Sequence, residues 1–208
     1  MTKARTLADF NATSIDPALL DDTGEIPSAL LAGVGGGIYE EITSYDIGND
    51  SEVFAENVFT DTYDNYMVLL QGISMETNNQ DFYLRFYDAN GSYTAEHTYA
   101  AQGQFHNNFD ENWSGSNSGA VKIMQAQGSG AGKTISGVIN FFDMKSSIDG
   151  LQRYTWQITG RKHDTNNGVV VGGGTVATAS ERTGFKLLAS AGNLMVGTVV
   201  VYGLKKTT

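Results

Sequence analysis

From residue 38 onward, the chain is divided into short runs of apolar or alternating residues by Gly, Asn and Asp, with no long helical pattern between them. Val, Ile, Tyr, Phe and Thr are frequent in these runs, as on the pleated surface of a sheet. We predict eleven strands, at 38–45, 52–58, 65–74, 81–88, 95–100, 120–126, 134–143, 151–160, 168–177, 184–189 and 195–205. Strands at this spacing predict an all-β sandwich or barrel rather than an α/β fold.

The alternation of side chains indicates which face of each strand is buried. Phe82, Leu84 and Phe86 point to one side of their run, and the same period of two appears over residues 154–158 and 185–189. The final run, Val196 to Leu204, is apolar on both faces. We therefore expect it to lie centrally in a sandwich or at a subunit contact, after a turn in which Gly192 takes a positive φ.

Residues 1–37 differ in kind from the rest of the chain. Short helical turns are expected over 2–10 and 26–31, and the glycine-rich run 33–37 forms a joint. Such a segment has too few apolar side chains to fold alone. We expect residues 1–37 to be an extended arm that docks on another protein, and residues 38–208 to be the domain. The expected anchoring side chains are Leu7, Phe10, Ile26, Leu30 and Leu31.

Charge and composition exclude several classes of protein. The chain of 208 residues has 23 acidic and 13 basic side chains, a net charge of −10, and a sequence pI near 4.6. This balance argues against binding to nucleic acid or to an anionic membrane surface. The absence of cysteine excludes disulfides and thiolate chemistry. No apolar run reaches the roughly 20 residues of a spanning helix, and no secretory signal is apparent, so we expect synthesis in the host cytoplasm.

No motif predicts a catalytic, cofactor-binding or metal site, and we expect no enzymatic activity. Residues 127–134 (QGSGAGKT) resemble a phosphate-binding loop, but Gln127 stands where the first glycine is required and a strand-like run follows. We interpret them as a hairpin loop. The three histidines are expected to be unrelated surface residues. The carboxylates at 61, 64, 81, 88, 110 and 111 have no calcium-loop spacing and are expected to be solvated.

The segment from Ala101 to Gly119 is expected to be a long polar loop, which in a compact domain is usually functional. Aromatic residues in and before it have two open interpretations: they contact a sugar or a protein partner, or they pack over the end of the sandwich. The candidate residues for a receptor-facing loop are Tyr93, Tyr99, Phe105, Phe109 and Trp113.

The two ends of the chain resemble structural proteins of tailed phages of aquatic bacteria. The opening, over residues 2–10 and 21–37, is similar to that of their tail-fibre and appendage proteins. The stretch Thr183–Lys205 resembles the last hairpin of a jelly-roll module in the same proteins, and residues 63–68 and 137–142 are similar in placement to its inner strands. This chain lacks the long shaft that separates anchor and module in a long fibre.

The resemblance implies a non-enzymatic virion protein in which an N-terminal anchor carries a jelly-roll-like antiparallel β-sandwich. We expect a homotrimer that docks on other virion proteins through its arm, as a short tail fibre or tail-attached appendage, and binds a host-surface glycan. One alternative is a capsid decoration or cement protein. A second is a carbohydrate-binding or carbohydrate-active domain, which would need paired carboxylates in one cleft for catalysis.

Overall fold

A computed structural model describes residues 39–88, 91, 97–106, 109–130, 132–148, 151–164, 166–177 and 179–205. The predicted arm, with Leu7, Phe10, Ile26, Leu30 and Leu31, lies outside the described residues. The boundary at residue 37 therefore stays a prediction. Within the described part, all regular secondary structure is β-strand, which confirms the all-β expectation.

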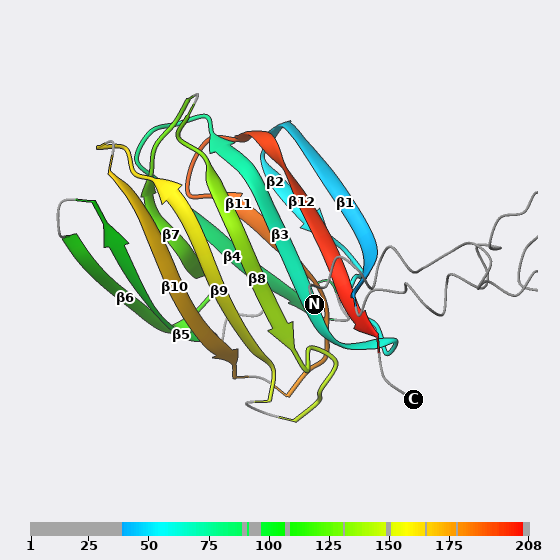
Figure 1. Ribbon diagram of the computed structural model, residues 1–208. Helices are drawn as coiled ribbons and strands as arrows, with labels where there is room; N and C mark the ends of the chain where they lie inside the picture. The colour runs from blue at the N-terminus through cyan, green and yellow to red at the C-terminus, as the bar shows by residue number, and fades with distance from the viewer. Residues whose placement is uncertain are drawn as a thin grey trace, which may run out of the picture. The chain divides into compact units, whose positions relative to one another are not determined.

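Two antiparallel sheets form a sandwich, with the larger sheet in front in Figure 1. The larger sheet has the order β1 (Tyr39–Asp50), β12 (Leu194–Lys205), β3 (Tyr63–Met75), β8 (Ile135–Phe142), β9 (Arg153–Arg161), β10 (Asn167–Val176), β5 (His97–Phe105), β6 (Phe109–Ser118). The smaller sheet has the order β2 (Glu52–Ala55), β11 (Arg182–Ala189), β4 (Gln80–Asp88), β7 (Val121–Gln127). All eleven predicted strands are present; β6 was not predicted.

The chain crosses repeatedly between the sheets: β1, β3, β5–β6, β8–β10 and β12 belong to the larger sheet, and β2, β4, β7 and β11 to the smaller. The last two strands, β11 and β12, were expected to form a hairpin, but they lie in different sheets. The turn between them instead links the two sheets, and Gly192 has the expected positive φ, of 70°. β12 pairs with β1 on one side and β3 on the other, so it lies inside the sheet, next to the edge strand β1.

The core lies between the sheets and follows the predicted alternation. Phe82, Leu84 and Phe86 of β4 are fully buried, as are Phe185 and Leu187 of β11 and Tyr154 and Ile158 of β9. The ring of Phe141 lies at the centre, with centroids 5.3, 5.4 and 5.2 Å from those of Phe59, Phe86 and Phe185. Aromatic rings at these separations add to the free energy gained by burial alone.

Glycines on the inner face of β10 make room for the rings of β9. A Cβ atom added to Gly172 would overlap the Trp156 ring, and one added to Gly174 would lie 2.5 Å from the Tyr154 hydroxyl oxygen. The register places each glycine opposite that same aromatic residue. Trp156 is only 2% exposed and Tyr154 is fully buried. Burial raises the pKa of the Tyr154 phenol, and the nearby Tyr99 adds to the shift, so this hydroxyl stays neutral.

Gly172→Ala should destabilise the domain by about 1–3 kcal/mol, because the added methyl group overfills a packed core. Gly173→Ala is the matched control: its Cβ would point to the other face of β10 and meet its nearest atom, the Tyr154 carbonyl oxygen, at 3.2 Å. Urea denaturation of both variants measures the difference. Equal free energies of unfolding in the two variants would show that the Trp156 ring does not need the space left by the missing side chain of Gly172.

Deleting residues 195–208 should abolish folding, because it removes the strand that joins β1 to the rest of the larger sheet. The loss also takes Val199 and Val201, both fully buried, out of the core. The measurement is thermal unfolding followed by circular dichroism. A truncated chain that stays in solution and melts cooperatively would show that β12 is dispensable.

Candidate functional site

The segment expected to be a long functional loop, Ala101–Gly119, is a β-hairpin instead. β5 pairs with β6 from His97 opposite Ser118 to Phe105 opposite Phe109, and β5 also pairs along its length with β10. The prediction of a loop was wrong because Gly, Ala, Gln, Asn and Ser dominate this stretch, and these residues give a weak strand signal. A period of two was nevertheless present: residues 97, 99, 101, 103 and 105 are buried, and 98, 100, 102 and 104 are exposed.

The aromatic candidates do not form one exposed cluster. Tyr99 and Phe105 are 8% and 5% exposed and belong to the core, which corrects the expectation that they face a partner. Trp113 is half-buried against the core, and its indole N–H donates a hydrogen bond of 2.8 Å to the Lys122 carbonyl oxygen. Tyr93 lies outside the described residues, as does the side chain of Phe109. For Tyr99 and Phe105, packing is the interpretation that holds.

Lys162, which follows β9, contacts both strands of the β5–β6 hairpin. Its ammonium group forms an ion pair with Glu111 of β6 and lies 4.9 Å from the centroid of the Phe105 ring in β5. The Lys162 side chain is 9% exposed, and that of Glu111 28%. The Lys162 charge is largely removed from water and that of Glu111 partly so. Removing either side chain would therefore leave a poorly hydrated charge without its partner and destabilise the fold.

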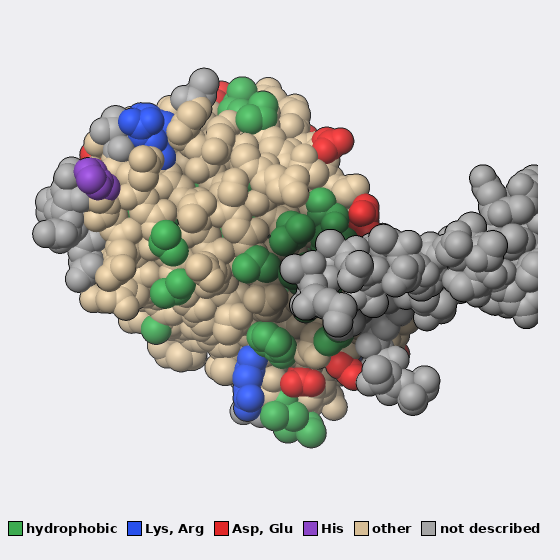
Figure 2. Space-filling model, viewed as in Figure 1, with side chains coloured by type: hydrophobic (Ala, Val, Ile, Leu, Met, Phe, Trp, Pro, Cys, Tyr) green, Lys and Arg blue, Asp and Glu red, His purple; other side chains and the backbone are tan. Residues whose placement is uncertain are grey.

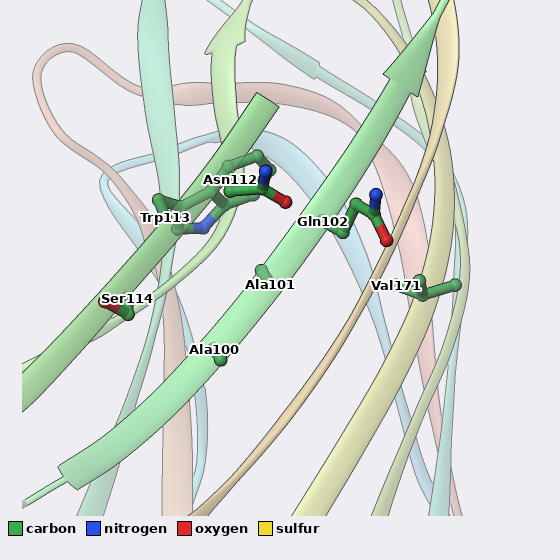
Figure 3. A pocket seen from close by; sticks show the side chains of 7 residues that line it. All are labelled: Ala100, Ala101, Gln102, Asn112, Trp113, Ser114 and Val171. Atoms are coloured by element: carbon green, nitrogen blue, oxygen red, sulfur yellow. The ribbon is translucent and has the colours of Figure 1, made fainter. Parts of the chain in front are cut away.

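The outer surface of the hairpin carries a shallow depression of about 440 Å³ (Figure 3). Two β5 residues, Ala100 and Gln102, lie between Val171 of β10 on one side and Asn112 and Ser114 of β6 on the other. All five are exposed, Val171 by 46%. Amides and a hydroxyl next to methyl groups suit a neutral, hydroxyl-rich ligand better than an ion.

In the described part of residues 127–134, groups that a phosphate loop would present have partners within the protein. The N–H of Gly128 donates to the Arg161 carbonyl oxygen at 2.9 Å, and the Lys133 ammonium donates to that of His163 at 3.3 Å. A strand, β8, follows rather than a helix. One correction is needed: the segment connects β7 and β8, which lie in different sheets, and is therefore no hairpin loop.

The histidines and carboxylates are dispersed. His97 was expected at the surface, but it is fully buried, with its ring centroid 5.1 Å from that of Phe86. Asp81 forms an ion pair with Lys122 at 2.7 Å and accepts a hydrogen bond from the Ala126 N–H. Among the described residues, no group of three or more His, Asp or Glu side chains is placed to hold a metal ion. None of the described segments is a helix long and apolar enough to cross a membrane.

Comparison with models of known protein families and with curated proteins finds no match to this chain. The outer residues of β5, β6 and β10 are therefore identified as the candidate site from the geometry of this molecule alone. Sequence reasoning missed Gln102, Asn112 and Val171, for which the only signal was the alternation along β5 and its neighbours.

Lys162→Ala should lower the free energy of unfolding by about 1–2 kcal/mol, between the values typical of exposed and of buried ion pairs. Hydrogen exchange of β6 amides should accelerate more than that of β12 amides. The control is Lys145→Ala, which removes the more exposed pair with Glu181 and should cost about 0.5 kcal/mol or less. Unchanged hydrogen exchange of the β6 amides in Lys162→Ala would show that Lys162 does not stabilise the β5–β6 hairpin.

Proposed function

We propose that this chain is a non-enzymatic structural protein of a tailed-phage virion. In this proposal, residues 1–37 anchor it to other virion proteins, and residues 38–208 form a jelly-roll module that is presented to the host surface. The module is a homotrimer, and the whole acts as a short tail fibre or tail-attached appendage.

The observation that carries the proposal is the strand order. Four strands of the larger sheet run β1-β12-β3-β8, and the smaller sheet runs β2-β11-β4-β7. The last strand of each set thus lies between the first two strands of its sheet, and all successive strands of the eight except β4 and β7 lie in different sheets. This interlocked order of eight strands supports a jelly roll, an architecture used by viral capsid proteins and lectins. The hairpins β5–β6 and β9–β10 widen one sheet of it.

The resemblance of both chain ends to phage appendage proteins supports the virion assignment, and the apolar side chains of the arm supply its anchor. Fold alone does not specify function, because one architecture serves many. The assignment is therefore tested on particles.

Antibodies against the purified chain, followed by electron microscopy of intact particles, should label the tail. Labelling over the capsid shell would replace the appendage by a decoration protein, and absence from particles would overturn the proposal. Deleting residues 1–37 should leave a folded domain that no longer joins particles. Normal incorporation of that variant would refute the anchor.

Light scattering of the purified chain should give three times the chain mass of 22.3 kDa. A mass equal to one chain at all accessible concentrations would contradict the trimer.

A further inference from the structure

Three shallow depressions adjoin one another on the outer face of the larger sheet. The first is the one over β10, β5 and β6 (Figure 3). A second, of about 680 Å³, is lined by Gln104, Thr159 and Val169 among others. A third, of about 440 Å³, is lined by Gln157 and again by Thr159. Thr159 joins the second to the third, and Val169 and Val171, two residues apart on the same face of β10, join the second to the first.

The strand register aligns polar and apolar side chains across these depressions. Val138, Gln157, Val171, Gln102 and Asn112 are successive partners on β8, β9, β10, β5 and β6. We call these five residues the amide row. With neighbouring strands about 4.8 Å apart, the row is about 19 Å long, and Gln157 and Gln102 are about 10 Å apart. Three primary amides and two valines thus lie along a line that crosses the strands, with Val171 between Gln157 and Gln102.

Acidic side chains are absent from the described residues that line the three depressions, although the chain has 23 of them. The basic groups in these linings are Arg161 and His106, both in the second depression. Figure 2 shows this face of the molecule, with its Asp, Glu, Lys and Arg side chains gathered toward the perimeter. A ligand on the amide row would therefore be held without ionic contacts.

We propose that the amide row binds a neutral oligosaccharide lying across strands β8, β9, β10, β5 and β6. This inference rests on the proposed function, because it names the surface and the ligand class through which the module contacts a host. Each primary amide both donates and accepts, so that one side chain can bond two adjacent hydroxyl groups of a sugar. The exposed methyl groups of Val171 contact the C–H face of a ring between two amides. The shallow depressions suit the side of a sugar chain rather than a buried terminal unit.

A second copy of the chain is the competing occupant, and the composition of the row argues against it. Interfaces between permanent subunits resemble a divided core and are more apolar than the surface. Here Gln157, Gln102 and Asn112 are exposed, and burying such flexible side chains would cost conformational entropy. A sugar offers each of them hydrogen-bond partners in return.

The test uses the full chain and immobilised short homo-oligosaccharides of glucose, mannose and galactose as probes. The double variant Gln102→Glu/Gln157→Glu keeps the side-chain size but removes the N–H donors. The matched control is Gln71→Glu on β3, which is also exposed on this face but lies outside the row. Unchanged melting temperatures establish that all three proteins are folded.

We expect the unmodified chain and the control to bind at least one probe equally, with little dependence on salt because no ionic contact is involved. The double variant should bind at least tenfold more weakly, a loss of about 1.4 kcal/mol. Absence of binding to every probe, or equal weakening by the control, overturns the inference. So does a double variant whose oligomeric mass falls, because the row would then be a contact between copies.

The two proposals fail separately. A chain that labels the tail of particles but binds none of the probes keeps the virion assignment and loses the amide row as a sugar site. A chain that binds a probe through the row but is absent from particles keeps the sugar site and loses the virion assignment.

Discussion

The sandwich depends on covering a sheet of eight strands when the opposing sheet has only four. The inner face of the wider sheet is covered in part by its own aromatic side chains, which lie over glycines of neighbouring strands. Trp156 and Tyr154 lie over β10 in this way, and Tyr99 lies so close to Gly115 of β6 that a Cβ there would overlap its ring. A ring packed over a glycine covers the backbone of the neighbouring strand, and Tyr154 also contacts Phe86 of the smaller sheet, with ring centroids 5.2 Å apart. The glycines thus let the added hairpins β5–β6 and β9–β10 bury aromatic side chains against the sheet to which they belong.

The same strands perform two tasks because successive side chains point to opposite faces. On β10, Gly172 and Gly174 face the core and seat aromatic rings, whereas Val169 and Val171 face outward. On β5, Tyr99 and Phe105 are buried, whereas Gln102 and Gln104 are exposed. The strand pairing fixes the backbone positions from which the outer amides extend. A binding surface built on paired strands needs little reorganisation when a ligand arrives, which is the physical advantage over the loop that had been expected there.

Predictions from the sequence were good where large apolar residues alternate with polar ones. β4, β9 and β11 were located, and their buried faces identified, because a period of two in bulky side chains has one physical explanation. The same reasoning failed for β6, where Asn, Ser and Gly give no strong pattern. It also left Tyr99 and Phe105 open between contact with a partner and packing, although the glycines opposite them in the sheet leave room for burial. The glycines had been interpreted as turns and joints, and several of them are packing sites within strands.

The sequence by itself determined the fold class, the strands with bulky cores and the central character of Val196–Leu204, because local alternation and apolar content decide these properties. Only the tertiary structure decided which strands are neighbours, and with it the link between sheets at residues 191–193 and the amide row. The reason is that the amide row crosses five strands, and some of its members, such as Gln157 and Gln102, are far apart in the sequence. Their alignment depends on which strands are neighbours, such as β5 and β10, and the alternation within one strand does not identify its neighbours.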